Sequence, residues 1–369
     1  MEIKEDMVNI QSTLNKRKDN KQKKSVWHRI IILLLTATII IVLGVGYYLY
    51  SIIYKPNINL DQSETEYIYI PSSATYTQVL DTLKSNNILY NLSSFQWVAE
   101  KKNYPRHIYG GRYLLRSGMN NNEIVNMLRS GKQDPVSFTF NNIKDINEIA
   151  GLASQDLEAD SSRIVQLCES KAFLKTLGLT PKEVSLLFLD DTYQFNWNTQ
   201  APEFLKRMNN EREKFWDNSR IEKAKKLNFT PFQVAILASI VQKESNIPSE
   251  KPVIAGVYLN RLRKNWPLQA DPTIVYANKD KIINRVLNIH LRVDSPYNTY
   301  IHTGLPPGPI CIPSKESIDA VLNADKHNYM YFCASPDLSG KHVFSRTLQQ
   351  HNRNARAYKR ALNKMKIFK

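Results

Sequence analysis

Glu244 is the residue of this chain whose type and surroundings are best suited to proton transfer. It ends a segment, beginning at Thr230, that is apolar on nearly every side, and such a segment predicts a buried helix. Leu237, Val241 and Glu244 lie on one face of that helix, because they follow i, i+4, i+7 spacing. A carboxylate beside apolar neighbours is desolvated, which favours the neutral form that a general acid needs. The alternative is a helix-end glutamate in a structural ion pair, and the helix by itself does not decide between the two.

Segments rich in amide and hydroxyl side chains follow this helix. A second helix is predicted over residues 250–264, with Ser249 as its N-cap, and a polar, proline-stiffened segment follows at residues 268–273. Residues 295–300 and 304–309 are further loops of this kind. Amide, hydroxyl and phenol groups suit the hydroxyl and acetamido groups of a sugar chain. These loops therefore favour a carbohydrate ligand.

Taken together, these segments resemble one family, the endolytic murein transglycosylases, also called the YceG-like or MltG family. The resemblance is carried by residues 238–245, 260–262, 268–273, 297–300 and 304–308 and by the closing pattern His342-x-Phe-x-x-Thr-x-x-x-His-Asn352. It implies that Glu244 is the catalytic acid and base. It also implies residues that line or support the substrate cleft: Gln269, Asp271, Thr273, Asn298, Thr299, Tyr300, Asn260, Arg261, His351 and Asn352. Residues 136–229 match the family weakly, and Asp190 stands where the family has a proline.

The activity implied by the resemblance needs only one carboxylate. Ordinary glycosidases use two. In a lytic transglycosylase of peptidoglycan, a neutral Glu244 would protonate the glycosidic oxygen between N-acetylmuramic acid and N-acetylglucosamine. The 6-hydroxyl of the muramic acid would then close onto C1 and return its proton to Glu244, leaving a 1,6-anhydro end. The implied substrate is the nascent glycan strand, whose elongation the cut would terminate, and no cofactor is implied.

Two other functions stay open. A cell-wall glycoside hydrolase would pair Asp271 with Glu244 as its second carboxylate, although an aspartate before a proline also suits a turn. A non-enzymatic wall-binding scaffold would use only the N-terminal part of the chain. That function leaves the polar segments after residue 230 unexplained.

The cysteines and histidines indicate no second reactive centre. Cys311 or Cys333 could act as a nucleophile with His342 or His351, but neither cysteine has an activating neighbour in the sequence. A disulfide between Cys311 and Cys333 is possible, and nothing in the sequence requires one. The histidines lack ligand-like spacing with acids, so no metal site is predicted.

The N-terminal part of the chain has the pattern of a membrane anchor. Residues 30–50 are almost wholly apolar and uncharged, and at about 1.5 Å per residue they reach about 30 Å, enough to cross a bilayer core. Residues 1–29 are rich in Lys and Arg, which predicts a disordered cytoplasmic tail. The expected location is the cell (inner) membrane, single-pass, with the catalytic part on the periplasmic or outer side. A cleavable signal peptide is the alternative, but the apolar run is long for one.

The remaining chain is predicted to be α+β. Residues 51–65 are expected to be a linker, residues 66–133 a small α+β module, residues 136–229 a mainly helical connecting region and residues 230–369 the catalytic region. The small module contains a weak repeat of strand, turn and helix, and it resembles a LysM glycan-binding module. A generic spacer is the alternative. Each repeat starts its helix with a capping-box pair, Thr75 with Gln78 and Asn120 with Glu123.

The chain has a formal net charge of +16. Such a charge suits an anionic partner such as a cell-wall polymer or lipid headgroups. Nucleic acid is the usual first candidate at this charge, but the predicted topology argues against it. Peptidoglycan glycan strands and the membrane are the expected partners, and the resemblance alone adds peptidoglycan synthases.

Overall fold

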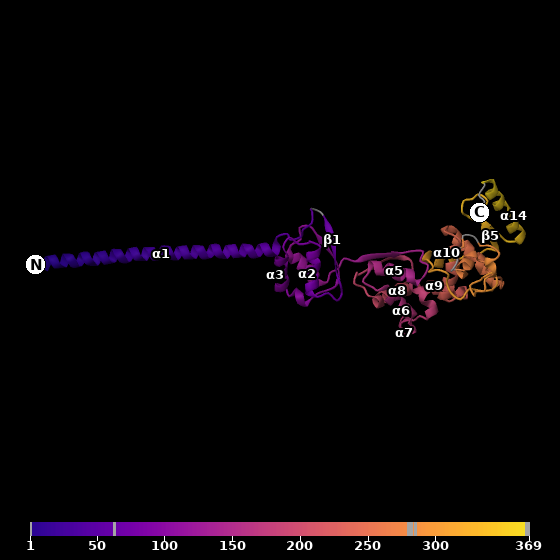
Figure 1. Ribbon diagram of the computed structural model, residues 1–369, viewed down its shortest axis with the longest axis horizontal. Helices are drawn as coiled ribbons and strands as arrows, with labels where there is room; N and C mark the ends of the chain where they lie inside the picture. Colours follow the sequence, from indigo (N-terminus) through magenta and orange to yellow (C-terminus); the bar gives the residue numbers. More distant parts are fainter. Residues whose placement is uncertain (1, 62–63, 279–282, 284–285, 366–369) are drawn as a thin grey trace. The chain divides into compact units, whose positions relative to one another are not determined.

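The computed structural model describes residues 2–61, 64–278, 283 and 286–365, with side chains from Trp27 onward. The fold is a mixture of helices and strands, as predicted. The chain divides into two compact units, Met1–Asp134 and Pro135–Lys369 (Figure 1).

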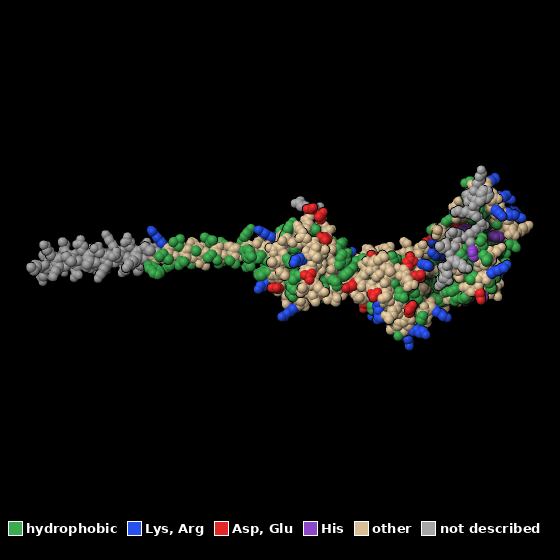
Figure 2. Space-filling model, viewed as in Figure 1, with side chains coloured by type: hydrophobic (Ala, Val, Ile, Leu, Met, Phe, Trp, Pro, Cys, Tyr) green, Lys and Arg blue, Asp and Glu red, His purple; other side chains and the backbone are tan. Residues whose placement is uncertain are grey.

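The chain begins with one long helix, α1 (Glu2–Tyr54). Its part Trp27–Tyr54 is long and apolar enough to cross a membrane, which agrees with the predicted apolar helix, and hydrophobic side chains cover it in Figure 2. The disorder predicted for residues 1–29 is wrong, because the helix already begins at Glu2. No glycine or proline precedes Gly44 in the sequence, and Lys, Glu, Gln and Arg propagate a helix at little cost.

The first unit continues with a strand pair and three helices. These elements are β1 (Thr65–Ile70), α2 (Tyr76–Ser85), α3 (Leu92–Lys101), the short η1 (Tyr104–Arg106), β2 (Gly111–Arg116) and α4 (Asn121–Ser130). The two strands are antiparallel, with Thr65 opposite Arg116. Both predicted capping boxes are present, at the starts of α2 and α4. The apolar faces of the helices pack on the strands and form one core.

Within the predicted linker at residues 51–65, residues between 52 and 60 are packed against this core. Ile52 at the end of α1 contacts the core, and Ile58 is buried in it. The buried Asn57 donates to Asn121 Oδ1 at 2.7 Å and accepts from the backbone N–H of Asn91 at 2.8 Å. The sequence hides this packing because the partners of Asn57 lie far along the chain. The apolar helix therefore enters the module directly.

The second unit has two cores. The first is built on β3 (Val136–Phe140) and β4 (Asp191–Phe195), an antiparallel pair. The helices around it are α5 (Ile146–Asp156), α6 (Ser161–Glu169), α7 (Lys171–Thr176), η2 (Pro181–Leu187) and α8 (Ala201–Phe215). Phe138 lies at its centre, edge-on to Phe195 and Phe204.

The second core is mainly helical and extends to the C-terminus. Its elements are α9 (Asn218–Lys226), α10 (Pro231–Glu244), η3 (Pro248–Glu250), α11 (Lys251–Arg263), α12 (Asp271–Ala277), η4 (His290–Arg292), α13 (Lys315–Leu322), β5 (Tyr331–Ala334), β6 (His342–Ser345) and α14 (Leu348–Lys364). Helix α10 joins the two cores, because Ala235 belongs to the first and Leu237 to the second. The N-cap predicted for α11 at Ser249 is wrong: a 3-10 turn precedes the helix and Glu250 takes that position.

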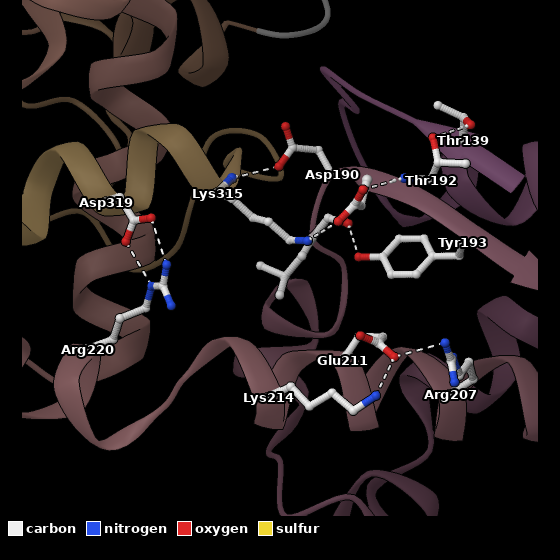
Figure 3. A network of polar contacts seen from close by, with 12 residues as sticks. Thr139, Asp190, Thr192, Tyr193, Arg207, Glu211, Lys214, Arg220, Lys315 and Asp319 are labelled. Atoms are coloured by element: carbon white, nitrogen blue, oxygen red, sulfur yellow. Dashed lines mark hydrogen bonds and ion pairs between the residues drawn. The ribbon is translucent and has the colours of Figure 1, made fainter.

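Ion pairs fasten α13 to the first core and to α9 (Figure 3). The backbone N–H of Lys315 donates to Asp190 at 2.6 Å, and its ammonium group lies 2.5 Å from Asp191. Arg220 on α9 binds both carboxylate oxygens of Asp319. Asp190, at a position where the resemblance predicts a proline, therefore holds the start of α13.

Candidate active site

Glu244 lies at the very end of α10, beside a pocket. The helix is buried from Val234 to Val241, so its position is fixed on all sides. The side chain of Glu244 is partly buried and lines a pocket of about 530 Å³. The other residues on the pocket wall are Lys144, Lys243, Asp271, Pro272, Val275, Tyr276 and Ile310.

Tyr258 of α11 holds the carboxyl group of Glu244 from behind. Its hydroxyl donates to Glu244 Oε1 at 2.5 Å, and the ring is fully buried. Burial and the neighbouring Glu244 raise the pKa of Tyr258 well above its ordinary value, so the phenol remains a donor. The sequence analysis missed Tyr258, because its neighbour on α10 is not apparent from spacing along α11.

The surroundings of Glu244 favour its neutral form. Desolvation raises the pKa of its carboxyl from 4.5 to about 7, and the nearby charge of Asp271 adds to the increase. The hydrogen bond from Tyr258 and the charge of Arg261 lower the pKa, but by less. At neutral pH the neutral and ionised forms are therefore both well populated, as a group that both gives and takes a proton requires.

Arg261 is a buried cation behind the same wall. Its Nε donates to the carbonyl of Met330 at 2.9 Å, and its Nη1 donates to the carbonyl of Leu268. Its guanidinium group lies about 6 Å from the rings of Tyr258 and Tyr331. Arg261 thus ties α11 to the segments that precede α12 and β5.

Asp271 is the second carboxylate of the pocket. It begins α12, and Tyr300 donates to its Oδ1 at 2.5 Å. Burial, followed by this hydrogen bond, raises the pKa of Tyr300 above its ordinary value. The pair Asp271–Tyr300 therefore joins two of the predicted segments at the pocket.

Three other predicted residues lie buried beneath this pair. The hydroxyls of Thr273 and Thr299 are 2.8 Å apart, and Thr299 Oγ1 accepts from the backbone N–H of Ala270 at 3.0 Å. Asn298 donates to two backbone carbonyls of its own loop, each at 2.9 Å. None of the three lines the pocket, so they support the loops that carry Asp271 and Tyr300.

The remaining predicted residues are not gathered at the pocket. Asn260 donates to the carbonyls of His327 and Tyr329 and lines a different pocket. Gln269 is exposed with a left-handed φ of 49°, and Asn352 is exposed on α14. The ring of His351 stacks on Tyr331, and burial lowers its pKa.

A buried glutamate, Glu250, fixes the turn after Glu244. It accepts from the backbone N–H and Nδ1 of His342, at 2.7 and 2.8 Å, and from Ser245 Oγ at 3.1 Å. Burial alone would raise the pKa of Glu250, but these hydrogen bonds outweigh it, and the pKa lies below its ordinary value. This contact explains why His342 belongs to the closing motif, and sequence reasoning missed Glu250.

The thiols do not support a cysteine nucleophile. All three cysteines are free, so Cys311 and Cys333 are not paired. Burial raises the pKa of Cys311 to about 11 and also raises that of Cys333, which keeps both thiols neutral at neutral pH. In the described part of the chain, no three His, Cys, Asp or Glu residues are placed to hold a metal ion.

Residues 68–357 match the model of the YceG-like family. The chain belongs to this family. The chain is 29% identical over 332 residues to the endolytic murein transglycosylase of Bacillus subtilis (strain 168), covering 85% of this chain and 90% of that protein. It is 24% identical over 346 residues to the protein of the same name from Streptococcus pneumoniae (strain D39), covering 84% of this chain and 61% of that protein.

A solved structure is also similar to this YceG-like chain. The crystal structure of a YceG-like protein from Listeria monocytogenes matches with a TM-score of 0.54 and 26% identity, over 79% of this chain and 98% of that chain. The predicted family is thereby confirmed, and the predicted enzyme class agrees with the names of the relatives.

Proposed function

We propose that this protein is a lytic transglycosylase of peptidoglycan in which Glu244 is the single acid and base. The observation that carries the proposal is the Glu244 carboxyl itself. Its pKa is raised to about 7, it lines a pocket, and one of its oxygens is held by Tyr258. The relatives named endolytic murein transglycosylase support the choice of substrate.

The proposed reaction conserves the proton of Glu244. Because Tyr258 donates to Oε1, the acidic proton resides on Oε2. Glu244 passes this proton to the glycosidic oxygen, and the bond from that oxygen to C1 of N-acetylmuramic acid breaks. The 6-hydroxyl oxygen of the same sugar bonds to C1, and its proton returns to Glu244. The products are a 1,6-anhydro end and a new N-acetylglucosamine 4-hydroxyl, and no water is consumed.

The neighbouring groups supply electrostatic support for this reaction. Tyr258 and Arg261 both favour the ionised Glu244 that exists between the two proton transfers. Asp271 offers negative charge on the same pocket wall, where the oxocarbenium-like centre carries positive charge. In this proposal Tyr300 positions Asp271 through its hydrogen bond, while Thr273, Asn298 and Thr299 hold the loops.

A hydrolase is the second candidate, because Glu244 and Asp271 line the same pocket. In that case Asp271 would be the nucleophile or the base that activates water. The chemical nature of the new glycan ends separates the two functions. Transglycosylation yields 1,6-anhydro ends, and hydrolysis yields reducing ends.

We further propose how the chain is placed in the cell. In this proposal Trp27–Tyr54 anchors the protein in the cell membrane, with residues 1–29 in the cytoplasm and the rest outside. The order β1–α2–α3–β2 supports a LysM-like module at residues 66–133, residues 136–229 connect it, and residues 230–369 carry catalysis. Cutting nascent strands close to the membrane would end their elongation. Peptidoglycan synthases are partners on family resemblance alone.

The deciding experiment is product analysis with the purified full chain in detergent. The wild-type protein and Glu244→Gln are incubated with peptidoglycan glycan, and the products are identified by mass spectrometry. We expect 1,6-anhydro ends from the wild type and none from Glu244→Gln. Glu222→Gln, which changes an exposed glutamate on α9, serves as the control. Reducing ends from the wild type would replace the proposal with the hydrolase, and unchanged cleavage by Glu244→Gln would remove Glu244 from the mechanism.

A further inference from the structure

Two lysines lie on the wall of the Glu244 pocket without an acidic partner. Lys243 precedes Glu244 on α10, and Lys144 lies just before α5. Both side chains are exposed, and no carboxylate in the described residues forms an ion pair with either ammonium group. Lys243 Nζ donates to the amide oxygen of Asn142 at 3.0 Å, which holds it toward the segment that carries Lys144.

The cleft continues past these lysines. A neighbouring pocket of about 500 Å³ shares Lys144 and Tyr276 with the Glu244 pocket. Its wall contains Asn147 and Ser185, and the buried Ser185 Oγ has no hydrogen-bond partner among the described residues. An orphaned hydroxyl is costly unless a ligand or water satisfies it, so this part of the wall is suited to a polar group.

The ionisable groups on the walls of these two pockets include acids as well as the two lysines. The acids that line these pockets are Glu244, Asp271 and Asp145. Glu244 is neutral when it acts as the acid, Asp271 is bonded to Tyr300, and Asp145 accepts from the backbone N–H of Glu148 at the start of α5. Asp271 and Asp145 keep their negative charges, so Lys144 and Lys243 are the cationic residues among those that line these two pockets, and neither ammonium group forms an ion pair with these acids.

We propose that Lys144 and Lys243 form a subsite that binds a carboxylate of the substrate beside the scissile bond. This inference rests on the proposed function and defines its substrate more narrowly. The muramic acid ring carries a lactyl arm, which ends in a carboxylate when bare and in a peptide with its own carboxylates when substituted. Either carboxylate matches two ammonium groups on one pocket wall. The subsite places the muramic acid, rather than the N-acetylglucosamine, on the side of Glu244 that faces Lys144.

The test compares charged and neutralised substrates with the full chain in detergent. One glycan carries peptides with free carboxylates, and a second is stripped of peptides and keeps its lactyl carboxylate. Converting the carboxylates of each to amides gives two further, neutralised glycans. The variants are Lys144→Gln/Lys243→Gln and the charge-keeping Lys144→Arg/Lys243→Arg. Lys225→Gln, an exposed lysine on α9, is the matched control.

We expect the double glutamine variant to raise KM about tenfold on a charged glycan, with kcat little changed, since two exposed charge contacts of ordinary strength are lost. On the amidated glycan the glutamine variant and the wild type should have the same KM. On the charged glycan the arginine variant should keep the wild-type KM. If KM increases only on the peptide-bearing glycan, the bound carboxylate belongs to the peptide. If KM increases on the stripped glycan, the bound carboxylate belongs to the lactyl group. Equal KM values of the wild type before and after amidation would overturn the subsite. An equal loss by the glutamine variant on amidated glycan would overturn it too.

A second measurement separates this inference from the proposed function. The dissociation constants of the same glycans are measured with Glu244→Gln and with Glu244→Gln/Lys144→Gln/Lys243→Gln. Weaker binding of charged glycan alone to the triple variant supports the subsite even if the wild type produces no 1,6-anhydro ends. Equal binding by the two proteins refutes the subsite even if cleavage follows the proposed course.

Discussion

At the scale of single residues, the pocket is organised around opposed influences on one carboxyl group. Burial and Asp271 raise the pKa of Glu244, while Tyr258 and Arg261 lower it. The result, about 7, allows Glu244 to give a proton and to take one back within a single turnover. A carboxyl group with a raised pKa also destabilises the folded protein when it is ionised. The effect on the pH profile of activity and the effect on stability can both be measured.

Replacing Tyr258 by Phe should move the pH profile of the enzyme. The hydrogen bond from Tyr258 lowers the pKa of Glu244, so its loss should raise that pKa further. Activity that needs neutral Glu244 should then persist to higher pH, while the maximal rate falls about tenfold because the carboxyl loses its fixed orientation. The measurement is kcat/KM against pH, with Tyr358→Phe on α14 as the control. An unshifted profile would contradict the assigned role.

Replacing Glu244 by Gln should stabilise the protein at alkaline pH. The folded pKa of about 7 lies above the ordinary value of 4.5, so folding is favoured by protonation and loses stability as pH rises between these values. Glutamine does not ionise, so the variant avoids the free-energy cost of a buried carboxylate. The variant should match the wild type at pH 4 and exceed it at pH 8 by roughly 2 kcal/mol, allowing for partial exposure of the side chain. Thermal unfolding of both proteins at the two pH values tests this, and a pH-independent difference would count against a desolvated carboxyl.

At the scale of helices and strands, α10 was the easiest element to predict and the loops after it were the hardest. Its apolar sequence and its Thr230 cap predicted a buried helix that ends at Glu244, as the structure has it. Tyr258 and Glu250 were not foreseen, because their partners lie on other elements and only the packed fold brings them together. Asn298 and Thr299 lie beneath Asp271 and Tyr300, but their motif did not reveal that their polar groups face inward.

The capping box at the start of α10 should stabilise the folded protein. Thr230 Oγ1 accepts from the backbone N–H of Gln233 at 3.2 Å, and the Gln233 side chain accepts from the backbone N–H of Thr230. Thr230→Ala should lower the free energy of unfolding by about 1 kcal/mol, because the first cap contact is lost. Thr230→Ser keeps the oxygen and should retain most of the stability. Unfolding in denaturant measures both variants, and equal stability of the two would show that the capping box contributes nothing.

At the scale of the whole molecule, the sequence separated the apolar helix from the folded part but misplaced the junction between them. Residues 51–65 have the composition of a connector, yet Ile58 is a core residue and Asn57 joins three segments. A single buried amide carries no periodic signal, so pattern reasoning could not find this junction. The long basic stretch before the apolar helix was likewise predicted to be disordered and is helical instead.

Replacing Asn57 by Ala should destabilise the packing of the segment that follows the apolar helix. Asn57→Ala leaves the polar groups of Asn121 and Asn91 without their Asn57 partner, which should cost about 2 kcal/mol and expose residues 52–60. Limited proteolysis of the full chain should then cut in this segment several times faster than in the wild type. Asn59→Ala, which removes a half-buried amide that donates to the carbonyl of Asn87, is the control. Equal rates for both variants would show that the junction does not depend on Asn57.

Helix α1 continues directly into the packed elements of the first unit, so the helix and these elements should rotate together. Because Ile52 and Asn57 lock the end of the helix into the module, rotation of the helix about its own axis turns the module by the same angle. If Trp27–Tyr54 spans a membrane as proposed, a second helix packed against this stretch would therefore fix the rotational orientation of the module without contacting it.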